Sequence, residues 1–303
     1  TRGTLPISAS QLWAFLNGEA ARNVQLIVLE WRLPRVMMAL LIGAALGVSG
    51  AIFQSLLRNP LGSPDILGFN TGAYSGVLVA LVLFQQNMEG MTLAALAGGL
   101  LTAGVVWLFS WRNGVETFRL IIFGISVRAL LMALNSWLII SASLEAALSA
   151  GLWSAGSLNG ITWAKTPPVI TVLLLALLAT GMLARRMRLL EMGDDTACAL
   201  GVPVERSRIM LMLTGVILTA ASTALAGPIS FIALLAPQIA RRLSGGTKGA
   251  LPLAALCGAL LLIAADYAAQ HFFLPYQLPV GVITVSLGGL YLIALLVREA
   301  RRQ

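Results

Sequence analysis

The sequence predicts an all-α, polytopic membrane protein with nine spans. Mean hydropathy is +0.88, only 11% of the 303 residues are charged, and long apolar runs recur along the chain. In soluble domains about a quarter of residues are charged, whereas a helix crossing a bilayer needs about twenty mostly apolar residues. Because the runs are continuously apolar and do not alternate with polar residues, they exclude a transmembrane β-barrel.

The apolar runs place the spans along the chain. An amphipathic segment at 1–35 comes first and is suited to a membrane interface. The predicted spans are 36–57, 66–84, 91–111, 119–140, 166–184, 209–226, a short one at 229–243, 250–270 and 280–297. Gly43 and Gly47 form a GxxxG pair, which predicts close packing of the first span against another helix. We interpret 1–303 as a single transmembrane domain.

Lysine and arginine set the orientation of these spans. With the C-terminus in the cytoplasm, 14 of the 20 basic residues lie in or beside cytoplasmic loops and five lie outside. Cytoplasmic loops of membrane proteins carry this excess of positive charge. The same orientation leaves Thr1 outside, in a sequence with no initiator Met and no signal peptide. We therefore expect a tenth span upstream of Thr1, which would come first and place both ends inside.

A polar segment at 187–208 interrupts the apolar pattern with helix signals of its own. Asp194 is placed to cap a short helix, and Gly201 is placed to end it. Pro203 and Glu205 then suit the first turn of a second short helix. A simple connection between spans needs no such structure. We interpret this segment as a cytoplasmic surface that receives a partner.

Several classes of chemistry are excluded by what the sequence lacks. The glycine-rich stretch at 245–249 contains a lysine without the GxxxxGK[ST] spacing of a P-loop. Cys198 and Cys257 are far apart with no CxxC pattern, and His271 is the single histidine. We therefore expect no metal site, no cofactor and no catalytic residue in this chain. The net charge of +8 is explained by loop arginines, and nucleic acid is not an expected partner.

A series of motifs runs in order along essentially the whole chain. They include WRLPR at 31–35, RNPLGSPDILG at 58–68, AGPISF at 226–231, APQIAR at 236–241 and LPVG at 278–281. This series resembles the permease subunits of type II ABC importers for iron-siderophores, haem and cobalamin. In finer detail the chain is similar to the members of that family that carry ferric enterobactin. The resemblance also implies ten spans.

The resemblance implies a set of partners and a mechanism. They are a second, homologous permease in a heterodimer, two copies of a cytoplasmic ATPase that bind and hydrolyse ATP, and a periplasmic siderophore-binding protein. The expected substrate is a ferric siderophore, carried across the bacterial inner membrane by alternating access. The alternative is a proton-coupled secondary transporter of similar span count. That alternative needs titratable groups in the membrane, and the spans offer little beyond Arg128 and Asp266.

The resemblance also assigns site residues at both ends of the spans. Arg32 and Arg35 either anchor a helix end at the headgroups or form sockets for carboxylates of the binding protein. A cytoplasmic gate is implied at Asn59, Leu61, Glu116, Thr117 and Phe118, although turn chemistry alone accounts for an Asn-Pro pair. Contact with the ATPase is implied for the 187–208 segment, with Glu191, Asp194, Asp195, Ala199, Gly201 and Glu205.

Arg128 is a charged residue inside a predicted span. It lies nine residues past Arg119, about 13 Å along a helix that rises 1.5 Å per residue. A charge at such depth costs about 2.5–3.5 kcal/mol and is expected to face a partner or water. Two interpretations remain open. Arg128 forms a buried ion pair with Asp266, or it lines the pathway and attracts anionic ferric catecholates.

Overall fold

The computed structural model describes residues 7–84, 88–111, 117–245, 250–273 and 276–300, in which every regular element is a helix. In chain order the α-helices are α1 (Ala9–Leu16), α2 (Arg22–Leu26), α3 (Leu33–Leu56), α4 (Phe69–Val82), α5 (Met88–Ser110), α6 (Thr117–Ser141), α7 (Leu144–Ser154), α8 (Pro167–Glu191), α9 (Asp194–Ala199), α10 (Val204–Ala226), α11 (Ile232–Leu243), α12 (Ala250–His271) and α13 (Val280–Ala300). A π-helical segment, Ile27–Arg32, joins α2 to α3.

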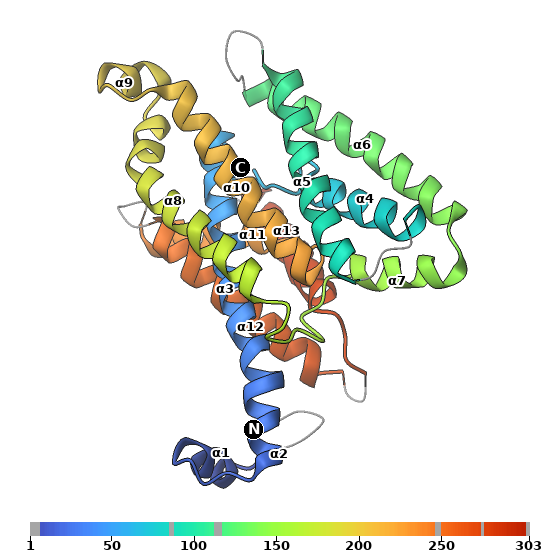
Figure 1. Ribbon diagram of the computed structural model, residues 1–303. Coiled ribbons are helices and arrows are strands. Elements are labelled where there is room, and N and C mark those ends of the chain that lie inside the picture. Colours follow the sequence, from blue (N-terminus) through green and yellow to red (C-terminus); the bar gives the residue numbers. More distant parts are fainter. Residues whose placement is uncertain (1–6, 85–87, 112–116, 246–249, 274–275, 301–303) are drawn as a thin grey trace.

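Helix α3 is the centre of the bundle. It packs against α8, α10, α11 and α12, while α4, α5, α6 and α7 form a second group beside it (Figure 1). In their most apolar stretches 72% of α3 is buried inside the chain, against 17% of α6. The central helix is therefore held by protein on most sides. Helix α6 offers most of its surface to lipid or to another subunit.

Glycines explain how α3 approaches its neighbours so closely. A Cβ atom on Gly43 would lie 2.4 Å from the carbonyl oxygen of Gly258, and one on Gly47 would lie 2.2 Å from that of Ala254. At Gly50 the distance to the Ala233 carbonyl oxygen would be 1.6 Å. Small residues permit this backbone contact between helices in a membrane. The close packing predicted from the GxxxG pair is confirmed.

The predicted spans correspond to helices of unequal length. Six stretches are long and apolar enough to cross a membrane: Arg22–Leu56, Gly90–Ser110, Phe118–Ser141, Pro167–Glu191, Val204–Ala226 and Leu251–His271. The predicted spans at 66–84 and 280–297 match the shorter apolar helices Phe69–Val82 and Val280–Ala294, and 229–243 matches the 12-residue α11. A total of nine or ten spans stays a prediction. Helix α7 was not predicted at all.

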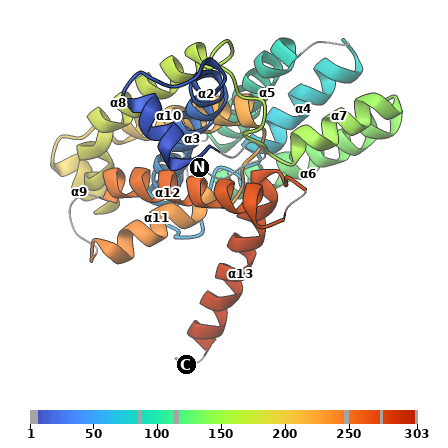
Figure 2. The same ribbon diagram turned by 90° about the horizontal axis from the view of Figure 1, so that it is seen from below.

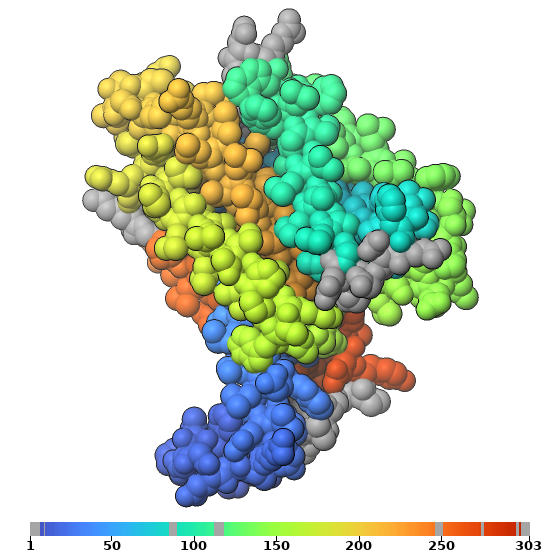
Figure 3. Space-filling view, in the orientation of Figure 1, coloured from blue at the N-terminus to red at the C-terminus, as the bar shows by residue number. Residues whose placement is uncertain are grey.

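The two ends of the bundle differ in form. Helices α1 and α2 project as a separate knob at one end, and α9 lies at the opposite end (Figures 1 and 3). The view along the bundle shows α13 extending away from the other helices (Figure 2). Its partners within the chain are α12 and α11. An apolar helix that leaves its own bundle in this way has surface available for a neighbouring subunit.

Candidate functional site

The segment at 187–208 contains one short helix, α9. Gly193, with a φ of 112°, precedes it, and Gly201, with a φ of 79°, follows it. Both backbone conformations suit glycine, because a Cβ atom would be strained at positive φ. The buried side chain of Ala197 fixes α9 against the bundle. The prediction that Gly201 ends a short helix is therefore confirmed.

The rest of that segment differs from the prediction. The first five residues belong to α8, which continues to Glu191. The expected second short helix is wrong, because α10 starts at Val204 and continues to Ala226 without a break. Pro203 lies just before the first helical turn instead of inside it. A proline that ends an extended connection can begin a long helix as readily as a short one, so the local signal could not fix the length.

Asp194 forms an ion-pair cluster at this end of the molecule. It is the first residue of α9 and not its cap, which corrects the prediction. Its Oδ1 accepts a hydrogen bond from Nη2 of Arg58 at 2.7 Å. Nη2 of Arg208 donates to both of its carboxylate oxygens at 3.0 Å. The cluster joins α9 to the start of α10 and to the loop that follows α3.

The loop after α3 holds the predicted gate residues Asn59 and Leu61. Oδ1 of Asn59 accepts a hydrogen bond from the backbone N–H of Leu61 at 2.9 Å, which is the turn chemistry expected of an Asn-Pro pair. Both residues are exposed. Arg58 begins this loop with a φ of 47°, an uncommon conformation for a residue with a side chain. The Arg58–Asp194 pair therefore connects the loop directly to the predicted coupling helix.

The same loop is tied to the C-terminal helices. Nε2 of Gln238 on α11 donates to the carbonyl oxygen of Pro60 at 2.9 Å, and the hydroxyl of Tyr291 on α13 donates to Oε1 of Gln238 at 3.2 Å. The guanidinium carbon of Arg242 lies 5.7 Å from the centre of the Tyr291 ring. Sequence reasoning missed Gln238 and Tyr291 as site residues. The APQIAR motif contains Gln238, but nothing local points to its partner.

The second half of the predicted gate is described only in part. Glu116 lies outside the described residues. Thr117 is the first residue of α6, and Phe118 beside it is 68% exposed. These residues therefore start a span at the same end of the molecule as α9.

The surface around α9 combines acidic and apolar groups. Glu191, Asp195, Ala199 and Gly201 are exposed, and Glu205 is partly exposed. Beside them Met192 and Leu200 are 64% and 58% exposed. Exposed apolar side chains surrounded by polar residues are typical of a protein–protein contact. We therefore expect this surface to be covered by another protein and not to remain exposed to solvent.

At the opposite end Arg35 and Asp266 form an ion pair between α3 and α12. Nε and Nη2 of Arg35 donate to the two oxygens of Asp266 at 2.9 and 2.7 Å. Nη1 of Arg35 donates to Oδ1 of Asn159 at 2.6 Å, and Nε2 of Gln270 donates to Oδ2 of Asp266 at 2.6 Å. The two charged side chains are only 18% and 8% exposed. Arg35 therefore already holds a carboxylate of its own chain.

Two predictions are affected by this pair. Asp266 is the partner of Arg35, so an ion pair between Arg128 and Asp266 is wrong. Arg32, the other predicted docking residue, ends the π-helical segment and is partly exposed. The indole N–H of Trp163 donates to the Leu29 carbonyl oxygen of that segment at 2.7 Å. The outer end of α3 is thus held by the loop that precedes α8.

Arg128 lies in a polar region between α4 and α6. Asp65, in the loop before α4, attracts its charge and accepts a hydrogen bond from the backbone N–H of Phe231. The side-chain amide of Asn70 donates to Asp65, and its Oδ1 accepts a hydrogen bond from Thr223 on α10 at 2.9 Å. Phe231 has a φ of 71°, which aims its N–H at this carboxylate. The Asp65 carboxylate is the counter-charge that the sequence analysis did not identify.

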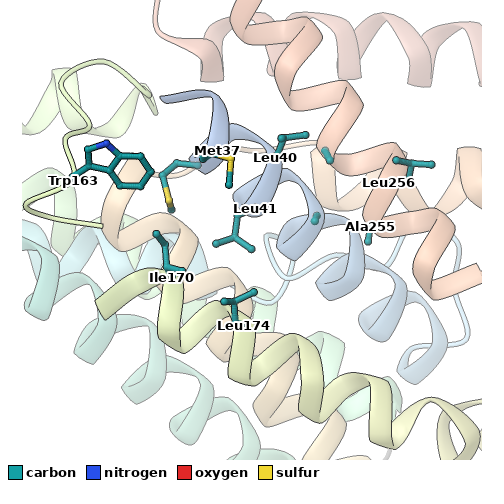
Figure 4. A pocket seen from close by; sticks show the side chains of 11 residues that line it. Met37, Leu40, Leu41, Trp163, Ile170, Leu174, Ala255 and Leu256 are labelled. Carbon is teal, nitrogen blue, oxygen red and sulfur yellow. The ribbon is translucent and has the colours of Figure 1, made fainter. Parts of the chain in front are cut away.

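A cavity elsewhere in the bundle is almost wholly apolar. It has a volume of about 460 Å³ and lies between α3, α8 and α12, with Met37, Leu41, Trp163, Leu174 and Leu256 among its lining (Figure 4). These side chains offer hydrocarbon surface and no charged group. The cavity therefore has no chemistry for recognising an iron chelate.

The described residues contain no group of three or more His, Cys, Asp or Glu side chains that could hold a metal ion. Cys198 is exposed and Cys257 is buried, and both are free thiols. The polar chemistry of the described chain is instead concentrated in two ion-pair clusters at opposite ends and one polar region between them. Together with the long apolar helices, this distribution is compatible with a membrane permease.

The chain belongs to the FecCD transport family, whose sequence profile matches residues 1–298. It is therefore a multi-pass inner-membrane permease, a translocation subunit and not an enzyme. It is 66% identical to the ferric enterobactin transport system permease protein FepG of Escherichia coli (strain K12) over 301 residues, which cover 99% of this chain and 91% of that protein.

Two further relatives agree with this family. The chain is 37% identical to the achromobactin transport system permease protein CbrC of Dickeya dadantii (strain 3937), over 98% of this chain and 86% of that protein. A solved structure described as an inward-facing conformation of a metal-chelate type ABC transporter has a TM-score of 0.83 at 28% identity, covering 92% of this chain and 89% of that chain.

Proposed function

We propose that this chain carries ferric enterobactin across the bacterial inner membrane as one half of a permease heterodimer. The observation that carries the substrate assignment is the 66% identity, over 99% of the chain, to a ferric enterobactin permease. Within this proposal the chain binds no cofactor. ATP is hydrolysed by two copies of a cytoplasmic ATPase, and a periplasmic binding protein delivers the substrate.

The surface around α9 supports contact with the ATPase. It presents exposed acidic groups beside the apolar side chains of Met192 and Leu200. Behind it, Asp194 connects α9 to Arg58 and so to the loop with Asn59 and Leu61. A displacement of α9 by the ATPase would therefore act directly on that loop. In this way ATP hydrolysis in the partner could change the conformation of the proposed cytoplasmic gate, as alternating access requires.

The exposed helices support a second permease. Helix α6 is mostly unburied, and α13 extends away from the bundle. Both helices have apolar surface that no other part of the described chain covers. A proton-coupled transporter is less well supported, because the spans hold few titratable groups and one of them, Asp266, is paired with Arg35.

The test is uptake of radiolabelled ferric enterobactin by a strain that lacks this subunit. Restoration by the wild-type chain is expected, with no uptake of ferrichrome or cobalamin through it. Equal restoration of all three would contradict the substrate assignment. Copurification tests the partners: the ATPase and the second permease are expected with the wild-type chain. Asp194→Arg on α9 should lower copurification of the ATPase, and Glu145→Arg, which changes an exposed acid in the first turn of α7, is its matched control and should leave copurification intact.

A further inference from the structure

The polar region around Arg128 borders a cavity. The contacts of Asp65 account for part of its polar lining but leave Arg128 and Asn135 without a hydrogen-bond partner in the described structure. Its volume is about 350 Å³, near the lower end of the range of about 300–1,000 Å³ for ligand pockets. It lies between α4, α6, the end of α7 and the segment that follows α10. In Figure 1 these elements lie on the side of the bundle away from α8.

One stripe of α6 supplies most of one wall. Arg128, Met132, Asn135, Ser136 and Ile139 all line the cavity, at the spacing that places residues on one face of a helix. Arg128 and Asn135 are seven residues apart, or about 10 Å along the helix axis. The cation and the amide therefore face the same space from positions about two turns apart.

The Arg128 guanidinium is available to a ligand. Among the described residues it makes no hydrogen bond and no ion pair, and the attraction of Asp65 acts at longer range. Asp65 itself is already engaged by Asn70 and by the backbone of Phe231. The backbone beneath Arg128 is fixed, because a Cβ atom on Gly68 would lie 2.9 Å from the Arg128 Cβ. An unsatisfied cation thus stands on a rigid support.

Asn135 gives the second, independent sign of a ligand. Its side chain is only 5% exposed, and its Oδ1 has no hydrogen-bond partner. A buried acceptor without a partner costs free energy, so native structures keep few of them. A ligand or water that donates a hydrogen bond from within the cavity would satisfy it.

We propose that this cavity is a transit site for one arm of an anionic, oxygen-rich iron chelate. Arg128 would receive an acidic oxygen, for which its planar guanidinium is suited. Asn135 would accept a hydrogen bond from an amide or hydroxyl group of the same arm. This inference rests on the proposed function, because a ferric catecholate has both the negative charge and the polar arms that the site requires.

The negative charge of Asp65 favours a site that binds the chelate weakly during passage over one that holds it tightly. Conduction through a membrane needs sites that attract the substrate enough for entry and weakly enough for release. Asp65 lines the same cavity and offsets part of the charge of Arg128. Recognition at low concentration would then be left to the binding protein, and the site would act on the rate of passage.

The test compares Arg128→Gln, Arg128→Lys and Asn135→Leu in uptake of radiolabelled ferric enterobactin, with Lys165→Gln on the exposed outer loop as the control. Arg128→Gln is expected to lower the maximal uptake rate at least about tenfold, the factor that one charge-assisted hydrogen bond provides. The KM, set by the binding protein, and ATPase stimulation by the loaded binding protein should be retained. Arg128→Lys should restore part of the rate.

Asn135→Leu provides a second test of the site in case Arg128→Gln does not fold. It replaces an unsatisfied acceptor with an apolar side chain of similar size, so normal abundance in the membrane is expected together with slower uptake. Wild-type uptake by Arg128→Gln, or by Asn135→Leu if Arg128→Gln does not accumulate, would overturn the transit site. Failure of the wild-type chain to restore any uptake would instead overturn the proposed function, and the transit site with it.

Discussion

Two ion-pair clusters hold opposite ends of this molecule, and they are built differently. At the end predicted to lie outside, Arg35 and Asp266 form a bidentate pair whose side chains are 18% and 8% exposed. At the end predicted to be cytoplasmic, one carboxylate, Asp194, is shared between Arg58 and Arg208, and Asp194 and Arg58 are 43% and 50% exposed. The first arrangement satisfies its charges inside the chain. The second leaves Asp194 and Arg58 open to solvent or a partner, while Arg208 is only 16% exposed.

The difference separates stability from motion. Removing one partner of a buried pair leaves an uncompensated charge and costs about 3–5 kcal/mol, whereas an exposed pair contributes about 0.2–1 kcal/mol. The outer pair is therefore a fixed connection between α3 and α12. The exposed Arg58–Asp194 pair can exchange partners at little cost when another protein covers α9. We expect variants at the two ends to fail in different assays.

The largest effect on stability is expected from Asp266→Leu. It strands the mostly buried Arg35 guanidinium and should lower the free energy of unfolding by about 3–5 kcal/mol. Thermal unfolding of the detergent-purified chain measures this change. The double variant Arg35→Met with Asp266→Leu should recover most of the loss, because it removes both charges. If Asp266→Leu and Arg35→Met each kept normal stability and lost only the uptake that depends on the binding protein, the result would support a docking role for Arg35 instead.

The opposite result is expected from Asp194→Arg. It places three cations together where Arg58 and Arg208 shared one anion, and most uptake of ferric enterobactin should be lost. Stability should fall by less than in Asp266→Leu, because Asp194 and Arg58 are both exposed and only Arg208 is mostly buried. Uptake and thermal unfolding are measured side by side. Adding Arg58→Asp should restore part of the uptake by rebuilding one pair. Intact uptake by Asp194→Arg alone would end the coupling interpretation of this cluster.

Features that depend on neighbours in the sequence could be predicted. The apolar runs gave most of the long helices, the GxxxG pair gave the close packing of α3 without naming its partner, and Gly201 gave the end of α9. Each of these signals is local, because a span, a small-residue face and a left-handed helix end are all specified within a few residues.

Features that depend on distant pairing could not be predicted. Arg35 and Asp266 are 231 residues apart, and Arg58 and Asp194 are 136 apart. A sequence shows that Arg128 and Asp266 are both charged and both within spans, but not which charge each one meets. Helix α7 was missed for another reason: it is a short helix capped by Ser143, between spans, where an apolar pattern carries little information.

A smaller effect is expected from Gly201→Ala at the end of α9. Gly201 has a φ of 79°, and a left-handed conformation costs a residue with a side chain about 1–2 kcal/mol. No atom would meet the added Cβ, so the cost is conformational only. The loss should fall on uptake as α9 shifts, measured against unchanged abundance in the membrane. Gly181→Ala on α8 is the matched control, since it also has open space but a helical backbone. Equal behaviour of the two variants would show that the position of α9 does not matter.

The smallest effect is expected from Tyr291→Phe, which tests how far the Asp194 cluster reaches. The variant removes only the hydroxyl that donates to Gln238 at 3.2 Å and should cost about 0.5–1.5 kcal/mol. Because Gln238 also holds the Pro60 carbonyl, the change should loosen α13 against the loop that begins at Arg58. Limited proteolysis of the purified complex, with and without ATP, measures this. If the cytoplasmic end is the mobile one, Tyr291→Phe should increase cleavage there and leave the Arg35–Asp266 end protected. Increased cleavage at the outer end instead would mean that the two clusters are mechanically linked, and the contrast between a fixed and a mobile end would fail.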